Sequence, residues 1–489
     1  ESFIVRSSCK REDSRSSSNA GAFLSLPNIT FKGLTFAINK VFQSYGDPNP
    51  ADQVLIQPNL QDVQCSGVAF SHDPASQAPY RVISWSTDGD TDNITRGNKG
   101  GQTLFSHRSN DTAEPHDIRG VIKLLNELEI CFNGKPIDIE FAFAKYKRKN
   151  KLFLLQLRPL IMTKKPISSD KHQKKLTRIE NYLTRAMKPT SFLKGNTTVF
   201  GVMPDWNPAE IIGLRPRALA KSLYRDLITD SIWAYQRSNY GYRNLRGFPL
   251  MVELEGLPYI DTRISFNSFI PQDISGDLAE KLVNHYIKTL IKHPVLHDKI
   301  EFDIVHSCYT LDLQDRLNDL PKSKFSSTEI HQISDSLLTL TNRILNPDDG
   351  LMVSDAKRIK TLKQRRNTVL NSDLTLIEKI YCLIEDGKRY GTLPFAGLAR
   401  AGFIAVQLLN SLVAKSILSL SETQHFLRSI RTVTSQMSDD FQNLELQIFL
   451  KHYGHLRPGT YDILSPRYDE QPSLYFNSEK PHSEGKRVS

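Results

Sequence analysis

The side chains best suited to chemistry gather at two places in the first third of this sequence. Arg6 and two serines follow a short apolar run that begins at Phe3. Glu140, Gln156 and Arg158 lie in two later stretches that are mainly apolar. Glutamate and glutamine oxygens are hard ligands that suit Mg²⁺, which normally arrives with phosphates, and an arginine fork can neutralise a phosphate oxygen. The two places therefore have the chemistry of the two ends of a nucleotide-phosphate site.

A β-hairpin is needed to bring the later residues together. Apolar and polar or small residues alternate from 137 to 144, which predicts a strand with one apolar face. A basic turn follows at 145–151, and a second strand returns. We expect two faces on the return strand, one with Phe153, Leu155 and Leu157 and the other with Leu154, Gln156 and Arg158. When the strands pair, Glu140 shares the second face; the alternative is a half-buried hairpin whose polar face is only hydrated.

Other short segments lie around these residues. In chain order the series is Val5-Arg6-Ser7-Ser8, Glu12-Asp13, Ala20-Gly21, Ser66-Gly67-Val68-Ala69-Phe70-Ser71-His72-Asp73-Pro74, Asp138-Ile139-Glu140 and Leu155-Gln156-Leu157-Arg158-Pro159. Over residues 1 to about 162 this series resembles the ATP-grasp domain of the phosphoenolpyruvate synthase and pyruvate phosphate dikinase family. One segment alone is weak evidence, whereas the ordered series is specific.

The resemblance implies a domain that binds ATP and Mg²⁺. It implies that Arg6 and Arg158 are catalytic arginines that contact the ATP phosphates, and that Glu140 and Gln156 hold Mg²⁺. It also implies that segment 54–57, which ends at Gln57, lines the adenine pocket. The implied reaction is of the dikinase type: ATP phosphorylates a histidine, AMP and phosphate are released, and the histidine passes its phosphoryl group to a small acceptor.

Two features depart from that family. No glycine- and lysine-containing segment precedes Arg6, although the family's ATP domain begins with one. None of the 13 histidines lies in a glycine-rich Thr-Ser-His-Ala-type motif, which carries the family's phosphorylated histidine. The chain also begins at Glu1, inside a motif. We therefore expect a fragment cut at both ends, with the phosphohistidine domain as its partner in the full-length chain.

Composition fits an ordinary globular enzyme of two or three domains, with 489 residues of which 39% are hydrophobic and 24% charged. The five scattered cysteines form no Cys-x-x-Cys pair, which is typical of reduced thiols and predicts a cytoplasmic protein. No apolar run approaches membrane-spanning length, so no membrane partner is expected. The net charge of +10 invites a nucleic-acid interpretation, but the basic runs lack interleaved aromatic residues, and we do not expect nucleic-acid binding.

The expected fold class is α+β, a partial ATP-grasp domain followed by a mostly α-helical central domain. We expect four regions: an ATP-grasp nucleotide-binding domain at 1–165 with its N-terminal part missing, a basic linker with a helical piece at 166–200, a mostly helical substrate-binding domain at 201–465, and a linker towards the absent phosphohistidine domain at 466–489. Helical spacing also predicts two buried stripes, one of Leu278, Leu282, Tyr286 and Leu290 and one of Leu376, Ile380, Leu383 and Ile384.

The acceptor is expected to bind in the central domain. Three of its segments are Pro204-Asp205-Trp206-Asn207-Pro208-Ala209-Glu210, Asp261-Thr262-Arg263 and Ser265-Phe266-Asn267-Ser268-Phe269. They do not resemble the barrel that binds pyruvate but resemble the L-glutamine kinases of capsule phosphoramidate biosynthesis, which phosphorylate the side-chain amide of glutamine. A zwitterion needs a cation for its carboxylate and an acid for its amine, and the residues of the right types are Glu210, Arg243, Asp261 and Arg263.

Helix capping and turn formation are the structural alternatives for these residues. Asn207, Pro208 and Glu210 have the types expected at an N-cap and in the first helical turn. Arg400 can reach an anionic substrate group or cap helix carbonyls, and the cap is favoured. Near residue 455, two histidines are spaced for a metal, but no third soft ligand is near, so a turn stabilised by Asp462 is favoured.

Three other functions stay open at this point. One is a dikinase-like phosphotransferase that acts on phosphoenolpyruvate-type or antibiotic substrates. The second is a non-catalytic protein with a degenerate ATP-binding fold, against which Glu140, Gln156 and Arg158 argue. The third is a basic binding module.

Overall fold

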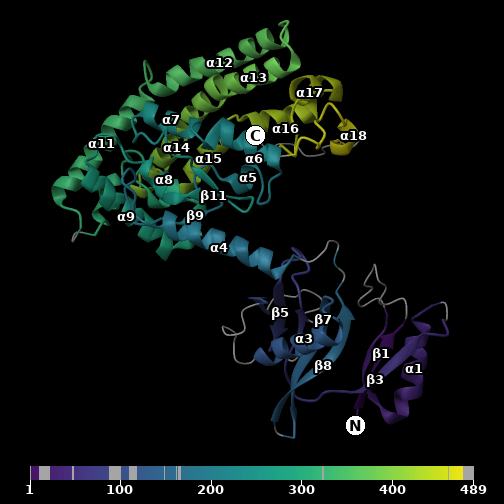
Figure 1. The fold of residues 1–489 in the computed structure, drawn as a ribbon. Helices are drawn as coiled ribbons and strands as arrows, with labels where there is room; N and C mark the ends of the chain where they lie inside the picture. The colour runs from purple at the N-terminus through teal and green to yellow at the C-terminus, as the bar shows by residue number, and fades with distance from the viewer. Residues whose placement is uncertain are drawn as a thin grey trace. The chain divides into compact units, whose positions relative to one another are not determined.

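Helix α4, Ser169–Ala186, contains the boundary between two compact units of the chain. In this computed structural model, unit 1 comprises residues 1–178 and unit 2 residues 179–489 (Figure 1). The structure describes residues 2–9, 23–46, 49–87, 101–108, 118–147, 149–160, 162, 167–321, 324–460 and 462–476. Unit 1 is built on antiparallel sheets and unit 2 is mainly helical, so the expected α+β class is confirmed.

Unit 1 contains a three-stranded sheet with strand order β2-β1-β3 and a five-stranded sheet with order β6-β5-β4-β7-β8. All described pairs in both sheets are antiparallel. The elements of unit 1 before α4 are β1 (Ser2–Ser8), β2 (Leu26–Thr30), the 3₁₀ turn η1 (Phe31–Gly33), α1 (Leu34–Gln43), β3 (Gln53–Pro58), β4 (Val63–Phe70), β5 (Tyr80–Ser86), β6 (Gln102–His107), α3 (Arg119–Cys131), β7 (Ile137–Tyr146) and β8 (Lys149–Pro159).

Helix α1 covers one face of the three-stranded sheet, as the ribbon shows (Figure 1). Val5 of β1 is fully buried in a cluster with Ala37 and Val41, which lie one turn apart on α1. Side chains alternate between the two faces of a strand, so Arg6 is placed on the face opposite Val5. The apolar run at the start of the chain therefore positions an arginine on the uncovered side of the sheet.

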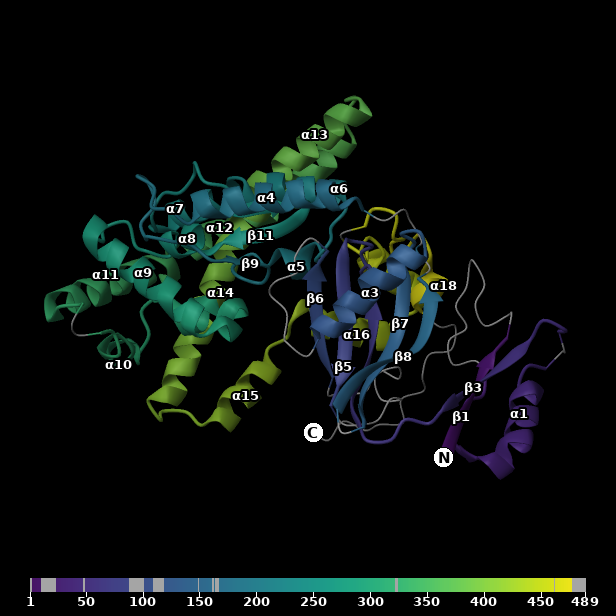
Figure 2. The ribbon, with the colours of Figure 1, turned by 60° about the horizontal axis from the view of Figure 1, so that its bottom comes forward.

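Helix α3 lies across one face of the five-stranded sheet (Figure 2). Ile137, Ile139 and Phe141 of β7 are buried in the cluster that this helix helps to form. Gly67 lies across from Phe141 on β4, where an added Cβ would meet the Phe141 ring at 2.7 Å and the carbonyl oxygen of Ser84. Glycine is thus required at this position because the aromatic ring packs directly over the backbone.

Strands β7 and β8 pair as the alternation predicts. Glu140 lies across from Gln156, and Asp138 lies across from Arg158. Residues directly opposite each other in a sheet point to the same face, as do residues two apart on one strand. The four polar side chains therefore share the face that α3 leaves uncovered.

A β-bulge on β8 corrects the expected faces of the return strand. The register shifts after Glu140, and Leu155 has no direct partner on β7. Beyond the bulge Leu154 lies across from Phe141, and Phe153 lies across from Ala142. The extra residue exchanges the faces of the upstream part of β8, which strict alternation cannot show.

Unit 2 combines a three-stranded sheet, with order β10-β11-β9, and many helices. Its elements are β9 (Phe200–Gly201), α5 (Pro208–Ile211), α6 (Ala218–Tyr224), the π-helical turn η2 (Arg225–Thr229), α7 (Ile232–Tyr240), β10 (Met251–Leu254), β11 (Leu257–Asp261), α8 (Thr262–Asn267), α9 (Gly276–Lys292), the 3₁₀ turn η3 (Pro294–Asp298), the π-helical turn η4 (Ile300–Ile304), α10 (Leu313–Asn318), α11 (Ser327–Leu345), α12 (Leu351–Leu370), α13 (Leu376–Asp386), the π-helical turn η5 (Gly387–Thr392), α14 (Leu393–Ala414), α15 (Leu420–Ser429), α16 (Val433–Asn443), α17 (Leu446–Tyr453) and α18 (Pro472–Tyr475).

The predicted stripe on α9 is confirmed as core. Leu278, Leu282, Tyr286 and Leu290 all have at most 2% of their surface exposed, and the four belong to one apolar cluster. This cluster extends to the C-terminal end of α8, where Phe266 is fully buried. Helical spacing here reports a real buried face.

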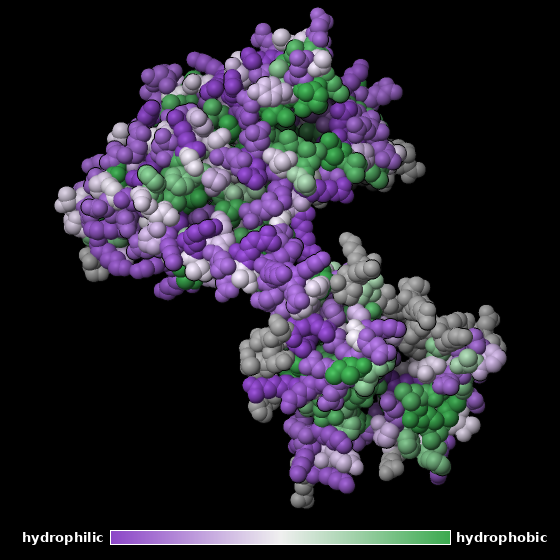
Figure 3. Space-filling view, viewed as in Figure 1, coloured by the Kyte–Doolittle hydropathy of each residue, from purple (hydrophilic) through white to green (hydrophobic). Residues whose placement is uncertain are grey.

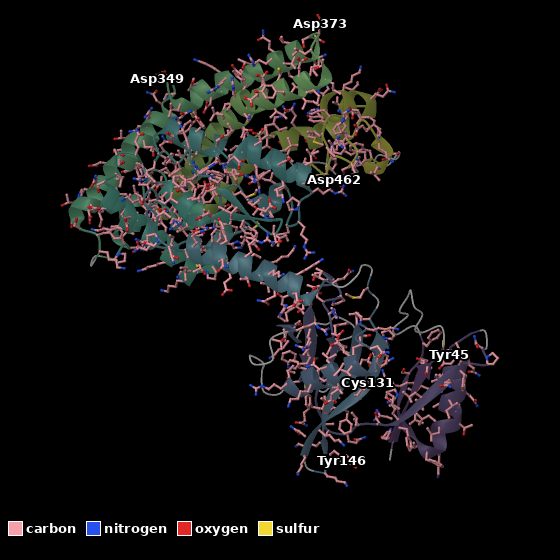
Figure 4. The ribbon with its side chains drawn as sticks, in the orientation of Figure 1. Tyr45, Cys131, Tyr146, Asp349, Asp373 and Asp462 are labelled. Atoms are coloured by element: carbon pink, nitrogen blue, oxygen red, sulfur yellow. The ribbon has the colours of Figure 1, made fainter. Side chains whose placement is uncertain are left out.

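The predicted stripe on α13 is largely wrong. The turn between α12 and α13 carries Asp373, labelled in Figure 4, and α13 begins three residues later. Leu376 is 76% exposed and Ile380 is 46% exposed, and apolar atoms show at the surface of unit 2 in Figure 3. An apolar stripe shows which residues share a helix face, but it does not show that another element covers that face.

One helical stretch in the described part of the chain, Leu376–Ala414, is long and apolar enough to cross a membrane by length and composition alone. This corrects the expectation that no apolar run approaches that length. The central helix of a folded domain can have the same length and apolar composition. In α14, Ile404 is fully buried in a cluster with Tyr240 and Leu340, and Arg400 is buried beside a carboxylate. These contacts are those of a helix packed inside unit 2.

The region expected to be a C-terminal linker is partly folded. Phe476 packs against Phe441 with ring centroids 5.1 Å apart, and Tyr475 donates a hydrogen bond to the carbonyl oxygen of Pro466 at 2.8 Å. Residues 466–476 therefore belong to the fold of unit 2, and residues 477–489 lie outside the described residues.

Candidate functional site

Arg6 joins the two sheets of unit 1. Its Nη2 donates to Glu140 Oε2 at 2.8 Å and to Gln156 Oε1 at 2.9 Å, and its Nη1 donates to the carbonyl oxygen of Leu155 at 3.4 Å. One arginine of the small sheet thus contacts both strands of the β7–β8 hairpin. The structure therefore brings together the two places where the sequence indicates phosphate and metal chemistry.

Arg158 completes this group of side chains. Its Nη2 lies 3.8 Å from Glu140 Oε1, on the oxygen that Arg6 does not contact. The side chains of Arg6, Glu140 and Arg158 are between 11% and 21% exposed, so the group is half-buried rather than freely hydrated. Asp138 lies across from Arg158 on the same face, so two guanidinium groups stand beside two carboxylates, and the arginines supply the cations that an anionic ligand needs.

The oxygens of Glu140 and Gln156 are already arranged around one cation. Both lie within 2.9 Å of the same guanidinium nitrogen, Arg6 Nη2. A carboxylate and an amide oxygen that converge on a positive atom form a donor pair of the kind that Mg²⁺ takes when phosphates and water supply its other ligands. Among the described residues there is no cluster of three or more metal-binding side chains, so a metal here needs a ligand that brings its own oxygens.

Gln57 is placed on the same side of the small sheet as Arg6. It lies across from Ile4 on β1, two residues before Arg6, and Leu55 lies directly across from Arg6 itself. Leu55 is 45% exposed. The segment expected to line an adenine pocket therefore presents an aliphatic and an amide side chain beside the arginine.

Other parts of the ordered motif series have different places. Glu12-Asp13 and Ala20-Gly21 lie outside the described residues. Ser71 Oγ accepts a hydrogen bond from the Ile137 backbone N–H at 2.9 Å, and so ties the end of β4 to the start of β7. Burial, and then the nearby Arg108 guanidinium, lower the pKa of His72 to about 4. This motif supports the hairpin and does not contact the Arg6 group in any described hydrogen bond.

Asp261 and Arg263, two of the expected acceptor ligands, form buried structural contacts. Asp261 is the N-cap of α8 and accepts from the backbone N–H groups of Arg263 and Ile264, and from Thr198 Oγ1. Burial raises the pKa of this carboxyl, although these hydrogen bonds and Arg263 act in the other direction. Arg263 donates to the carbonyl oxygens of Lys188 and Ala186, both at 2.8 Å, and so caps the end of α4. The fold uses the carboxylate of Asp261 and both terminal nitrogens of Arg263, whereas Arg263 Nε has no hydrogen-bond partner among the described residues.

Glu210 and Arg243 have less buried surroundings than Asp261 and Arg263. Glu210 is exposed and follows Asn207, whose side chain accepts from the Glu210 backbone N–H at 3.1 Å, so the capping alternative holds for this segment. Arg243 is half-buried, and burial lowers its pKa. No described hydrogen bond or ion pair connects Glu210, Arg243, Asp261 and Arg263 as one group, and their role as acceptor ligands stays a prediction.

A different group of charges lies at the centre of unit 2. Arg237 on α7 donates to Asp205 through Nη1 at 3.0 Å and Nη2 at 2.6 Å. Its Nη2 also lies 3.7 Å from Glu301 Oε1 in η4, and Glu301 Oε2 lies 2.9 Å from Arg400 Nη1 on α14. We call Asp205, Arg237, Glu301 and Arg400 the buried charge cluster; all four side chains are at least nine-tenths buried.

Segments that lie far apart in the sequence supply the buried charge cluster. Asp205 comes from the segment that ends at Glu210, Ser265 follows the Asp261 segment, and Arg400 ends a later motif. Ser265 Oγ donates to Asp205 Oδ2 at 2.6 Å, so these distant segments meet. The ring of Phe269 lies 4.0 Å from the Arg237 guanidinium carbon and 4.9 Å from that of Arg400. Arg400 pairs with a carboxylate here and does not cap helix carbonyls as expected.

The later histidine motif forms a turn, as expected. Asp462 accepts from the Leu464 backbone N–H and from Arg217 Nη1, at 3.0 and 3.1 Å. Figure 4 labels this aspartate on unit 2. The described part of the chain shows no metal cluster at the motif.

No protein-family model matches the chain, and no curated protein matches it. A solved structure of D-alanine–D-alanine ligase from Helicobacter pylori aligns with 33% of this chain and 42% of its own, at 16% identity and a TM-score of 0.20. The aligned part is less than half of that ligase, and so low a TM-score carries no argument about fold or function.

Proposed function

We propose that this chain is the nucleotide-binding and acceptor-binding part of an ATP-dependent phosphotransferase of the dikinase type. The observation that carries the proposal is the convergence of Arg6, Glu140, Gln156 and Arg158 from three strands of two sheets. Two antiparallel sheets, each with a helix on its far face, bring their uncovered faces together at this point. This is an arrangement that an ATP-grasp domain needs.

The residues fit a nucleotide with its Mg²⁺. Glu140 and Gln156 would hold the metal, which when bound supplies charge neutralisation and alignment of the phosphate oxygens. Arg6 and Arg158 neutralise phosphate oxygens through their planar forks. Arg6 pairs with Glu140 at 2.8 Å, so this half-buried carboxylate has a cation beside it.

Strand β3 would form the part of the site that contacts adenine. Leu55 and Gln57 share a face with Arg6, so an apolar surface and an amide stand next to a phosphate-binding cation. A purine needs such a surface and a few directed hydrogen bonds. The proposed order along this face is therefore base, then phosphates, then the metal-binding oxygens of the hairpin.

The rest of the reaction lies in the full-length protein. A phosphohistidine on a domain outside this chain would carry the phosphoryl group to a small acceptor, for which the side-chain amide of L-glutamine is proposed. Splitting the transfer into two covalent steps lets one mobile histidine serve two separate sites. The protein would act in capsule biosynthesis in the cytoplasm. Unit 1 contributes preorganised charge to the first step.

Nucleotide binding by the chain itself tests the proposal. Titrate ATP into the 489-residue chain by calorimetry, with and without Mg²⁺, and repeat with Glu140→Gln and Arg158→Met. We expect Mg²⁺-dependent binding that each substitution weakens about tenfold or more, because each removes a charged contact. Glu329→Gln, which alters an exposed ion pair with Lys281 in unit 2, is the matched control and should bind normally. Absence of ATP binding, or equal binding by all variants, contradicts the proposal.

A further inference from the structure

The two halves of the buried charge cluster differ in how well their atoms are satisfied. Asp205 and Arg237 share two aligned hydrogen bonds, and two serines complete them: Ser265 donates to Asp205, and Ser268 accepts from Arg237. Asp205 also holds a left-handed backbone conformation, with φ at +56°, which such contacts must stabilise. This half is closed and has the geometry of a structural ion pair.

The other half, Glu301 and Arg400, is open. Glu301 Oε2 and Arg400 Nη1 are 2.9 Å apart but are not aligned as a hydrogen bond, and within the described residues neither atom has a hydrogen-bond partner. Arg400 Nε also lacks a partner there. Burial disfavours the charged form of Arg400, yet the carboxylate of Glu301 raises its pKa above the ordinary value, so the guanidinium stays charged. Buried charged groups normally have their donors and acceptors satisfied.

Gln407, two turns after Arg400 on α14, adds an open acceptor. Its Nε2 donates to the carbonyl oxygen of Glu301 at 3.2 Å, and its buried Oε1 has no hydrogen-bond partner among the described residues. The open atoms thus belong to three side chains that meet around Glu301. They are two N–H donors of a cation, one carboxylate oxygen and one amide oxygen.

The backbone around these residues is unusual. Glu301 lies inside the π-helical turn η4, and the π-helical turn η5 leads directly into α14, which carries Arg400 and Gln407. A third π-helical turn, η2, comes just before α7 and its Arg237. Such turns are rare in proteins and occur often at functional sites, where they aim side chains that a regular helix would direct elsewhere.

We infer that Glu301, Arg400 and Gln407 bind a small zwitterion, an α-amino acid, in the interior of unit 2. The Arg400 N–H groups donate to its carboxylate, and Glu301 Oε2 accepts from its ammonium group. Gln407 Oε1 accepts from a further N–H of the ligand. A ligand that is only anionic leaves Glu301 unmatched, and one that is only cationic leaves Arg400 unmatched.

This ligand would be the phosphoryl acceptor, and that identification rests on the proposed function, whereas the binding itself does not. The buried charge cluster then replaces Glu210, Arg243, Asp261 and Arg263 as the acceptor site. The closed pair Asp205–Arg237 contacts the other carboxylate oxygen of Glu301, because Arg237 Nη2 lies 3.7 Å from Oε1 whereas Arg400 approaches Oε2.

Calorimetry of the 489-residue chain without ATP tests the inference with three probes. They are L-glutamine, N-acetyl-L-glutamine, which lacks the ammonium charge, and the α-amide of L-glutamine, which lacks the carboxylate. We expect saturable binding of L-glutamine and at least tenfold weaker binding of both derivatives, since each loses one charged contact. If L-glutamine, L-glutamate and L-asparagine all fail to bind at millimolar concentration, or if the derivatives bind as well as L-glutamine, the inference is wrong.

Two variants locate the site. Arg400→Gln should abolish binding, and Gln407→Leu should weaken it several-fold without leaving a charge unpaired. Arg217→Gln, which breaks an exposed ion pair with Asp462, is the control and should bind normally. If circular dichroism shows that Arg400→Gln does not fold, Gln407→Leu decides. Unchanged affinity in Gln407→Leu, or in folded Arg400→Gln, overturns the inference.

The same chain titrated with ATP and Mg²⁺ separates this inference from the proposed function. Binding of ATP without any amino acid refutes the zwitterion site alone. Binding of an amino acid without ATP refutes the nucleotide proposal and leaves the zwitterion site standing.

Discussion

Arg6 and Glu140 are joined by a 2.8 Å hydrogen bond that connects the two sheets of unit 1. The two residues are 134 positions apart in the chain, and the same arginine nitrogen also reaches Gln156. This bond gives the half-buried carboxylate of Glu140 a paired cation. Under the proposed function, Arg6 would leave Glu140 when Mg²⁺ and phosphates bind.

Substitution of Arg6 by methionine should loosen the contact between the sheets. Charge-assisted hydrogen bonds that are partly exposed contribute on the order of 1 kcal/mol, so we expect several-fold faster amide hydrogen exchange in β1 and near Leu155 of β8. Hydrogen-exchange mass spectrometry measures this. Lys32→Met, at an exposed lysine of the same unit, is the control. Exchange in Arg6→Met that matches the wild type would show that the bond does not hold the sheets together.

The stability of unit 1 should fall in acid because of His72. Burial and Arg108 lower its pKa from 6.5 to about 4, so the unfolded chain takes up this proton near pH 6.5 and the folded chain only near pH 4. The contribution is fully present above pH 6.5 and is lost as the pH falls towards 4. Urea unfolding followed by the fluorescence of Trp85, with both tryptophans of unit 2 replaced, should show a loss on the order of 1–2 kcal/mol between pH 7 and 4.5. His72→Gln should reduce this pH dependence; an identical pH profile contradicts the assignment.

Gly67→Ala should strongly destabilise the five-stranded sheet. The added Cβ meets the Phe141 ring and the Ser84 carbonyl, and neither can move without disturbing the cluster under α3. Overpacking of this kind typically costs about 1–3 kcal/mol. Gly120→Ala on α3 is the control, because its new Cβ lies 3.6 Å from the side chain of Leu152, an ordinary contact. Denaturant midpoints for the two variants test this, and equal midpoints count against the packing.

Arg237→Met should strongly destabilise unit 2, and adding Asp205→Asn to this variant should restore part of the lost stability. The single change leaves the carboxylate of Asp205 buried without its cation, which typically costs about 3–5 kcal/mol. Asp205→Asn removes that charge and keeps a residue that tolerates the left-handed backbone at this position. The double variant is therefore expected to be more stable than Arg237→Met alone. A double-mutant cycle of unfolding free energies measures the difference, and additive losses would mean that the two side chains do not interact.

Local pattern was enough to predict several elements. Period two between 137 and 144 predicts β7 and places Glu140 on its polar face, and helical spacing predicts the buried stripe of α9. The Asn207 cap is likewise a matter of neighbouring residues. These features depend on dihedral preferences and on spacing along a few residues, which the sequence contains directly.

Tertiary packing decided what these faces meet. Spacing could not reveal the bulge at Leu155, because an inserted residue is defined by the partner strand. Spacing could not show that Leu376 is exposed, because the sequence of one helix does not determine whether another element packs against its apolar face. The charged residues of unit 2 show the same limit, because Asp261 and Arg263 cap backbone groups while Glu301, which has no motif of its own, pairs with Arg400.

The sequence by itself determined which side chains are available and on which face of a strand or helix they lie. The meeting of Arg6 with Glu140, and of Arg400 with Glu301, was decided only by the fold. Each of these contacts joins segments about a hundred or more residues apart. Closing such a loop costs chain entropy, and this cost is offset only when the surrounding apolar clusters are buried together. The physical reason is that a half-buried or buried charge is positioned by its neighbours in space, and these neighbours are assembled by burial of the rest of the chain.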